Sequence, residues 1–155
     1  MKTLLEYNKT WLAGFLDGEG CFVACYTSDK NFCVSLSINL RADDINILKM
    51  ISSTFGNIGN IHEYSSEYVS KFDKTHRNAV AMFKISNISM LYENVITLLD
   101  EYPLLSKKRK DYIIWRRIIE LLYQTKHKKF SRNKVKEEII ELVDKLHKIK
   151  KYQEI

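Results

Sequence analysis

Residues Leu12 to Gly20 read LAGFLDGEG, and their pattern predicts a short helix that ends at glycines. Ala13, Gly14 and Gly18 are small residues on this helix, so a second helix could approach its backbone closely. A contact of the helix with its own copy would be isologous and would imply two-fold symmetry. Glu19 would then meet its symmetry mate, and two carboxylates attract hard divalent ions such as Mg²⁺. An ordinary glycine-ended helix with a solvated Glu19 is the alternative.

Two strands and a helix follow this segment, and the same order then repeats. Alternation of apolar and polar residues predicts the strand from Phe32 to Arg41 most clearly, with one face buried. Turn residues, helix caps and apolar residues at helical spacing predict the other elements. The expected order is a helix at 8–18, strands at 21–27 and 32–41, a helix at 43–55, a strand at 57–64, a polar loop at 65–78, a strand at 79–86, and helices at 88–101, 106–124 and 131–151.

Paired hairpins separated by helices predict an α+β fold. The predicted core is αββαββα, with a curved antiparallel four-stranded sheet, helices on one face of it and additional C-terminal helices. We expect a single domain over residues 1–155, with its core at about 8–125 and the C-terminal helix at about 131–151.

The composition is that of a basic, globular protein. Of the 155 residues, 45% are hydrophobic and 28% are charged, which excludes a disordered chain. The formal net charge of +6 suits a polyanionic partner such as nucleic acid, although an ordinary basic protein has the same balance. No apolar run approaches a membrane span, and residues 1–7 lack the apolar segment of a signal peptide. We therefore expect an intracellular protein with no membrane partner.

Three cysteines, Cys21, Cys25 and Cys33, lie close together in the sequence. An odd number of cysteines without a secretion signal favours reduced thiols over disulfides. A zinc site is the alternative, but the spacing lacks a paired C-x-x-C and no histidine lies nearby. We therefore expect small, buried cysteine side chains.

Three segments together resemble the LAGLIDADG homing endonucleases. LAGFLDGEG (Leu12 to Gly20) fills the family's whole nine-residue motif, and LRADDINILKMISSTFGNIGNI (Leu40 to Ile61) and YPLLSKKRKDYIIW (Tyr102 to Trp115) resemble its later blocks. The resemblance covers roughly residues 10–125. It implies an endonuclease, usually encoded within an intron or intein, that makes a double-strand break in a long, near-palindromic DNA site. Because the chain has one motif, the resemblance implies the homodimeric type.

The resemblance also implies roles for residues of the motif. Glu19 would be the metal-binding carboxylate, and the backbone carbonyl of Gly18 would be a second metal ligand. The cofactor would be Mg²⁺, which activates a water and clamps the oxygens of the phosphodiester. Each subunit would cut one strand across the minor groove and leave short 3′ overhangs. The implied dimer interface contains Trp11, Ala13, Gly14, Asp17 and Gly18, with Asp17 bracing the helix end.

Two further catalytic roles of the family map less directly onto this chain. A basic residue near the scissile phosphate falls within residues 106–109, where we favour Lys107 over Lys108. Cations at a helix N-terminus oppose the helix dipole, so a nearby phosphate would explain them better than helix stability does. The family often has a glutamine after the second strand. This chain has none there, and Arg41 or Asn39 is the candidate replacement.

A curved antiparallel ribbon fits the DNA major groove, where each base pair presents a distinct edge. The face of the predicted sheet that points away from the core carries side chains suited to reading bases. We expect these to be Val23, Cys25, Thr27, Ser35, Ser37, Asn39, Arg41, His62, Tyr64, Lys84 and Ser86. Phosphate contacts are expected from Lys128, Lys129 and Arg132, and from the basic residues of the 65–78 loop. A plain solvent-facing sheet is the alternative.

Two other functions stay open at this point. A maturase of the same fold would bind intron RNA, and a DNA-binding regulator would bind without cutting, although the acid at Glu19 argues against the regulator. The expected partners are double-stranded DNA and a second copy of the chain, with RNA only for the maturase. Abundant isoleucine, lysine and asparagine with a single proline indicate an A+T-rich genome. We therefore expect an organelle, mitochondrion or chloroplast, or a microbial cytoplasm.

Overall fold

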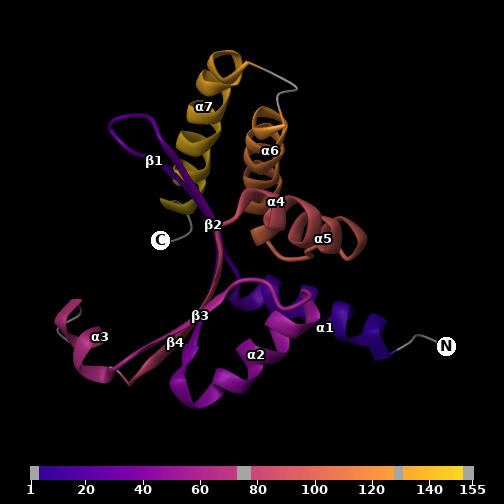
Figure 1. Cartoon of the computed structure of the whole chain (residues 1–155), viewed down its shortest axis with the longest axis vertical. Helices are drawn as coiled ribbons and strands as arrows, with labels where there is room; N and C mark the ends of the chain where they lie inside the picture. The colour runs from indigo at the N-terminus through magenta and orange to yellow at the C-terminus, as the bar shows by residue number, and fades with distance from the viewer. Residues whose placement is uncertain (1–3, 73–77, 128–130, 152–155) are drawn as a thin grey trace.

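The structure is a computed structural model, and it describes residues 4–72, 78–127 and 131–151. Strands and helices alternate along most of the chain, and helices alone form its C-terminal part (Figure 1). In order, the elements are α1 (Leu4–Glu19), β1 (Cys21–Tyr26), β2 (Phe32–Arg41), the 3₁₀ turn η1 (Ala42–Asp44), α2 (Ile45–Thr54), β3 (Asn60–Tyr64), α3 (Ser66–Phe72), β4 (Val80–Ile85), α4 (Ile88–Met90), the π-helical η2 (Leu91–Ile96), α5 (Thr97–Glu101), α6 (Lys108–Lys126) and α7 (Arg132–Lys151).

The strands form one antiparallel sheet in the order β1-β2-β4-β3. Strand β1 pairs with β2 and β3 pairs with β4, and the two hairpins join because β2 also pairs with β4. A short turn joins β1 to β2, whereas α3 lies between β3 and β4 and α2 lies between β2 and β3 in the chain. The predicted α+β fold, with a four-stranded antiparallel sheet, helices and C-terminal helices, is confirmed.

Apolar side chains of one sheet face pack against the helices to form the core. Phe22, Leu36 and Phe83 from the strands are buried, as is Trp115 from α6. Trp115 Nε1 donates a hydrogen bond to the Val23 carbonyl oxygen at 3.0 Å, which fixes α6 across β1. Figure 1 shows α1, α2 and the α4–α6 region on the same side of the sheet. The other side, called the open face below, is not covered by these helices.

Helix α7 protects the outer edge of β1, which is an edge strand of the sheet. His147 Nε2 lies 2.9 Å from the Ala24 carbonyl oxygen, and Lys150 Nζ donates to the Phe22 carbonyl oxygen. Unpaired backbone groups on an exposed edge otherwise attract strands from other molecules. The apolar side of α7, including the buried Ile139, packs on α6, as its helical spacing predicted.

Two segments differ from the sequence-based expectation. The 65–78 stretch is not a loop throughout, because the Ser65 hydroxyl accepts a hydrogen bond from the Tyr68 amide at 3.2 Å and caps α3. The Tyr68 ring stacks on Tyr64 at 5.3 Å, which ties α3 to β3. The helix expected at 88–101 does form, but it widens into a π-helix at Leu91–Ile96. Apolar spacing alone does not reveal such a change of hydrogen-bond pattern.

The expectation that the polar side of β2 is exposed is wrong at two serines. Ser35 is 4% exposed and Ser37 is 8% exposed, although both alternate with buried apolar residues and so belong to the open face. Strand β2 is flanked by β1 and β4, whose larger side chains Val23 and Lys84 stand directly opposite Ser35 and Ser37. Small hydroxyls in the middle of a sheet are therefore shielded by neighbouring strands even without a helix above them.

Candidate functional site

The last turn of α1 places Glu19 at the start of β1. The Gly20 amide donates to the Leu16 carbonyl oxygen at 2.9 Å, and a Cβ atom at Gly20 would lie 2.6 Å from that oxygen. Only glycine fits this position, so the chain passes from helix to strand across a single residue. Glu19 is exposed as the last residue of α1. The backbone of Glu19 is therefore fixed at one end of the sheet, and its carboxylate is accessible to a ligand.

Asp17 braces the end of α1 against the segment that leads into α6. Its Oδ2 accepts hydrogen bonds from the Leu105 and Ser106 amides at 3.0 and 2.9 Å, and its Oδ1 accepts one from the Ser106 hydroxyl at 2.6 Å. Burial alone would raise the pKa of Asp17. The hydrogen bonds from the Ser106 hydroxyl and the two amides together outweigh burial, so this pKa lies below its usual value. Asp17 thus has the bracing role that was expected of it.

Lys108 brings a cation to the carbonyl end of α1. Its Nζ donates to the Gly18 carbonyl oxygen at 2.8 Å and to the Leu16 carbonyl oxygen at 3.5 Å. An ammonium group is favourable there because a helix C-terminus carries the negative end of the helix dipole. Burial lowers the pKa of Lys108, and the nearby acidic groups, Asp17 and Glu19 among them, only partly offset this. A partly buried lysine with a lowered pKa beside an exposed carboxylate is typical of a functional site.

Lys107 does not share this position, and the preference for Lys107 over Lys108 is not supported. Lys107 is the exposed N-cap residue of α6, whereas Lys108 is half-buried and begins the helix. Successive residues of a helix point about 100° apart, so only one of the two neighbours can turn toward the end of α1. The sequence could not decide between them because it does not show the direction in which α6 starts.

The groups at the end of α1 suit a hard divalent cation. The Glu19 carboxylate and the Gly18 carbonyl offer oxygen donors, which Mg²⁺ prefers. Within residues 4–72, 78–127 and 131–151, no three His, Cys, Asp or Glu side chains are grouped to hold a metal. In the structure, the Gly18 carbonyl oxygen accepts a hydrogen bond from the Lys108 ammonium. A metal ion at this oxygen would therefore have to displace the lysine.

One side of α1 exposes small residues beside an aromatic one. No atom lies within 4 Å of a Cβ built at Gly14 or Gly18, so both positions face open space. Trp11 is 40% exposed and stacks on Phe15, with ring centroids 5.0 Å apart. Ala13 is only 6% exposed and belongs to the core of its own chain, so its expected place on the exposed contact side is wrong. Neighbouring residues of a helix point about 100° apart, so Ala13 faces the core while Gly14 faces outward.

Leu105 is a residue that the sequence reasoning missed. Its side chain is 87% exposed, and its backbone amide donates a hydrogen bond to Asp17 Oδ2 at 3.0 Å, which places Leu105 near the end of α1. A large apolar side chain with this exposure, held close to the end of α1, is a candidate for contact with another surface. The sequence signal is weak, because a leucine ahead of a helix is usually buried.

The end of β2 reaches the same end of the sheet as Glu19. Strands β1 and β2 are antiparallel and Cys21 pairs with Ser37, so Asn39 and Arg41 continue past the start of β1. Both side chains are exposed. The Arg41 guanidinium forms an ion pair with Asp43 at 2.8 Å. Asn39 and Arg41 therefore stay the candidates for a polar residue near Glu19, although Arg41 would have to leave Asp43 to act there.

The other candidates for reading bases differ in exposure and position. The exposed ones are Thr27, His62, Lys84 and Ser86, and the half-buried ones are Val23, Cys25 and Tyr64. Thr27 belongs to the β1–β2 turn, where its hydroxyl accepts a hydrogen bond from the Asn31 amide at 3.2 Å, and Ser86 follows the end of β4. Lys128 and Lys129 lie outside the described residues, as does the side chain of Arg132.

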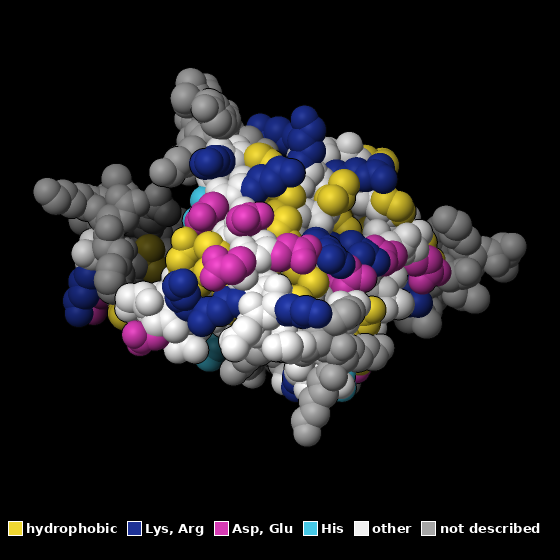
Figure 2. Space-filling model, turned by 90° about the horizontal axis from the view of Figure 1, so that it is seen from above, with side chains coloured by type: hydrophobic (Ala, Val, Ile, Leu, Met, Phe, Trp, Pro, Cys, Tyr) yellow, Lys and Arg dark blue, Asp and Glu magenta, His cyan; other side chains and the backbone are white. Residues whose placement is uncertain are grey.

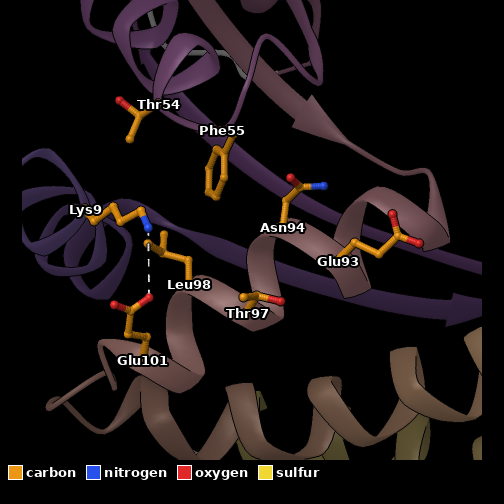
Figure 3. Close-up of a pocket in the computed structure, with 8 residues that line it drawn as sticks. All are labelled: Lys9, Thr54, Phe55, Glu93, Asn94, Thr97, Leu98 and Glu101. Carbon is orange, nitrogen blue, oxygen red and sulfur yellow. Dashed lines mark ion pairs between the residues drawn. The ribbon is translucent and has the colours of Figure 1, made fainter. Parts of the chain in front are cut away.

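Other surfaces are weaker candidates than the end of α1. A hollow of about 160 Å³ lies between α1, α2 and the η2–α5 helix, and Lys9 and Glu101 approach each other there to 4.0 Å (Figure 3). Lys9 lies ten residues before Glu19 on α1, about 15 Å along the helix. On the face seen in Figure 2, basic and acidic side chains are interleaved, so the positive charge is not gathered into one patch there.

Known sequences share the motif and its surroundings. The family model for the LAGLIDADG endonucleases matches residues 12–119. The Neurospora crassa protein named probable intron-encoded endonuclease 2 is 27% identical over 126 residues, which cover 77% of this chain and 25% of that protein. The Saccharomyces cerevisiae protein named uncharacterized mitochondrial protein RF1 is 27% identical over 106 residues, covering 68% of this chain and 20% of that protein. The chain thus spans a quarter or less of these two relatives.

Solved structures share the fold. The LAGLIDADG meganuclease I-AabMI, crystallised with uncleaved DNA, is 27% identical with a TM-score of 0.68, over 86% of this chain and 42% of that one. Meganuclease I-SmaMI, crystallised with uncleaveable DNA, has a TM-score of 0.70 at 22% identity, over 88% of this chain and 43% of that one. With the motif at the end of α1, the αββαββα core and a family match over residues 12–119, the chain belongs to the LAGLIDADG endonuclease family.

Proposed function

We propose that this chain is a metal-dependent, sequence-specific homing endonuclease that makes a double-strand break in a long, near-palindromic DNA site. The observation that carries the proposal is the arrangement at the end of α1, where the exposed Glu19, the Gly18 carbonyl and the Lys108 ammonium lie together. These groups combine oxygen donors for a hard cation with a positive group for a phosphate. DNA as the substrate is supported by I-AabMI and I-SmaMI, which were crystallised bound to DNA.

A second αββαββα unit would complete the site, and we propose that a second copy of the chain supplies it. A two-fold partner would place one Glu19 at each DNA strand. The surface for this contact is the exposed side of α1 with Trp11, Gly14 and Gly18, together with the adjoining Leu105. This chain corresponds to 43% of I-SmaMI, so that protein has room for a second unit within one chain. In a homodimer the second copy would take this place.

The residues of the site would divide the work of phosphodiester hydrolysis. Mg²⁺ bound there would lower the pKa of a water and neutralise charge on the scissile phosphate. Glu19 and the Gly18 carbonyl would hold the ion, and Lys108 would move its ammonium from that carbonyl to a phosphate oxygen. Asn39 or Arg41 would orient the attacking water, since both lie at the same end of the sheet.

The open face would read the DNA sequence. Asn39, Arg41, His62 and Lys84 are exposed and carry groups that pair with base edges in the major groove. Ser35 and Ser37 would contact a base only where its edge reaches between β1 and β4. Val23, Cys25, Thr27, Tyr64 and Ser86 would complete this face, and Lys128, Lys129 and Arg132 are proposed to contact phosphates.

The domain and cellular setting are also proposals. We propose that residues 1–155 act as one endonuclease domain, with α7 fixed to its edge strand. An intron-encoded relative and a mitochondrial relative support expression from an intron of an organelle or microbe. Among the described residues, no helix combines the length and apolar character needed to cross a membrane.

Assembly can be tested at Gly14. We expect the protein to sediment as a dimer at micromolar concentration and Gly14→Leu to sediment as a monomer that still unfolds cooperatively. The reason is that Gly14 has open space in its own chain, so a leucine would clash only with a partner. Asn46→Leu, at an exposed position of α2, is the matched control and should stay dimeric. A monomeric wild type, or a dimeric Gly14→Leu, would contradict the proposed contact.

The activity can be tested with an unbiased DNA pool. We expect the protein with Mg²⁺ to cut one near-palindromic sequence and to leave 3′ overhangs, which sequencing of the cut ends would reveal. Specific binding without cutting would point to a DNA-binding regulator instead. Tight binding of the surrounding intron RNA without DNA cutting would point to the maturase.

A further inference from the structure

The three cysteines lie on the open side of the β1–β2 hairpin, and the expectation that they are buried is wrong. Cys21 and Cys33 are exposed and Cys25 is half-buried. The alternating pattern of β1 turns Phe22 and Ala24 into the core and leaves Cys21 and Cys25 on the opposite face. The proposed cleavage chemistry does not use these thiols.

Cys25 and Cys33 stand directly opposite each other in the hairpin. They are partners in the β1–β2 register, and their thiols interact by a side-chain hydrogen bond. Directly paired residues of an antiparallel sheet have Cα atoms about 4.5 to 5.5 Å apart and side chains on the same face. A disulfide needs Cα atoms about 4.4 to 6.8 Å apart and Cβ atoms about 3.5 to 4.5 Å apart, so the Cα spacing of a direct pair suits one and only a small approach of the two Cβ atoms is needed.

The turn next to this pair holds the two strands in register. The Thr27 amide donates to the Asn31 carbonyl oxygen at 3.0 Å, and the Lys30 amide donates to the Thr27 carbonyl oxygen at 2.8 Å. On the other face, the Tyr26 and Phe32 rings meet edge to face at 6.5 Å. The hairpin end is therefore fixed on both faces, which keeps Cys25 and Cys33 together.

We propose that Cys25 and Cys33 are a redox modification site that closes to a cross-strand disulfide when a low-molecular-weight disulfide such as oxidised glutathione reaches the open face. This proposal goes beyond the nuclease function and holds whether or not the open face binds DNA. Cys21 stays reduced, because it pairs with Ser37 and lies four residues from Cys25, about 13 Å along the strand.

The reaction follows ordinary thiol–disulfide exchange. The exposed Cys33 loses its proton and attacks one sulfur of oxidised glutathione, so a Cys33–glutathione bond forms and one glutathione leaves as the thiol. Cys25 then loses its proton and attacks Cys33 Sγ, so the protein disulfide forms and the second glutathione leaves as the thiol. Two protein thiols are oxidised, and one glutathione disulfide is reduced to two thiols. Burial and the Cys33 thiol raise the pKa of Cys25, which makes Cys33 the first to react.

The test is to treat the whole protein with oxidised glutathione and count thiols under denaturing conditions. The wild-type chain has three cysteines and should keep one titratable thiol. Its mass should fall by two hydrogen atoms, and peptide mapping should link the Cys25 and Cys33 peptides. Dithiothreitol should restore all three thiols. The oxidised protein should also melt at a higher temperature, because the cross-link restricts the unfolded chain.

Serine variants separate this pair from other outcomes. Cys21→Ser is the matched control, and its two remaining thiols should both be lost on oxidation. Cys25→Ser and Cys33→Ser should form no internal disulfide and should show no oxidative rise in melting temperature. A stable glutathione adduct, a disulfide between two molecules, or three unchanged thiols in the wild type would overturn the proposal. Equal thiol loss in Cys33→Ser and the wild type would do the same.

Discussion

Glu19→Gln is expected to abolish DNA cutting while leaving DNA binding intact. The amide keeps the shape of the side chain but lacks the negative charge that a hard cation requires. Loss of a preorganised electrostatic group costs about a hundred- to a thousandfold in rate, and a lost metal ion should cost at least that much. Binding should survive, because it comes from the open face and the basic surface. It should even strengthen in the absence of metal, since one acid facing the phosphates is gone.

The measurement pairs a gel-shift titration in Ca²⁺ with a plasmid-cutting time course in Mg²⁺. Asp17→Asn is the matched control, an acid-to-amide change two residues away. Asp17 accepts three hydrogen bonds from Leu105 and Ser106, so its amide variant should melt at a lower temperature. Glu19→Gln should melt like the wild type, because Glu19 is exposed. Near-normal cutting by Glu19→Gln would remove this residue from the mechanism.

Lys108→Met is expected to have the second-largest effect on cutting. Lys108 is the basic side chain in contact with the Gly18 carbonyl, and a divalent ion at that oxygen would push its ammonium toward the phosphate. Removing a charge that stabilises the transition state should slow cutting by about a hundred- to a thousandfold. Methionine keeps the length and the apolar stem of the side chain, so the half-buried position stays filled.

Lys107→Met is the control for this experiment, because it removes the same charge from the neighbouring residue. Lys107 is exposed at the N-cap of α6, so its variant should cut at close to the wild-type rate. Single-turnover cutting rates with saturating protein separate chemistry from binding. If the two variants lose cutting equally, the lysines act only through general positive charge. If Lys107→Met is the slower one, the contact between Lys108 and Gly18 is not the functional arrangement.

The competition between Lys108 and a metal ion follows from the same contact. In the free protein the ammonium satisfies the Gly18 and Leu16 carbonyls at the negative end of α1. A cation is thus present at the helix end before any metal arrives, which stabilises the helix C-terminus. Displacing the ammonium costs free energy and opposes metal binding, and a phosphate that receives the lysine would offset this cost. DNA and metal would therefore bind to this site cooperatively.

Local sequence patterns were sufficient for the order of the strands and for every helix region except α3. The expected strand at residues 32–41 matches β2 at both ends, because alternation with period two is read from neighbouring residues. The nine residues of LAGFLDGEG also specified the helix end and its carboxylate, since Gly20 is the only residue that fits beneath the Leu16 carbonyl. Helix α3 was missed because its seven residues make only about two turns and are too few to show a helical period, and its cap and its Tyr64 contact are what stabilise it.

Contacts between distant segments settled the features that local patterns left open. Lys108 and Gly18 are 90 residues apart in sequence, and the direction of α6, fixed by the Asp17–Ser106 bonds, brings Lys108 and not Lys107 to α1. Burial of Ser35 and Ser37 depends on which strands flank β2, and pairing with β4 crosses an intervening helix. Ala13 is likewise buried where exposure was expected, because burial is a property of what packs against a side chain and not of its own polarity.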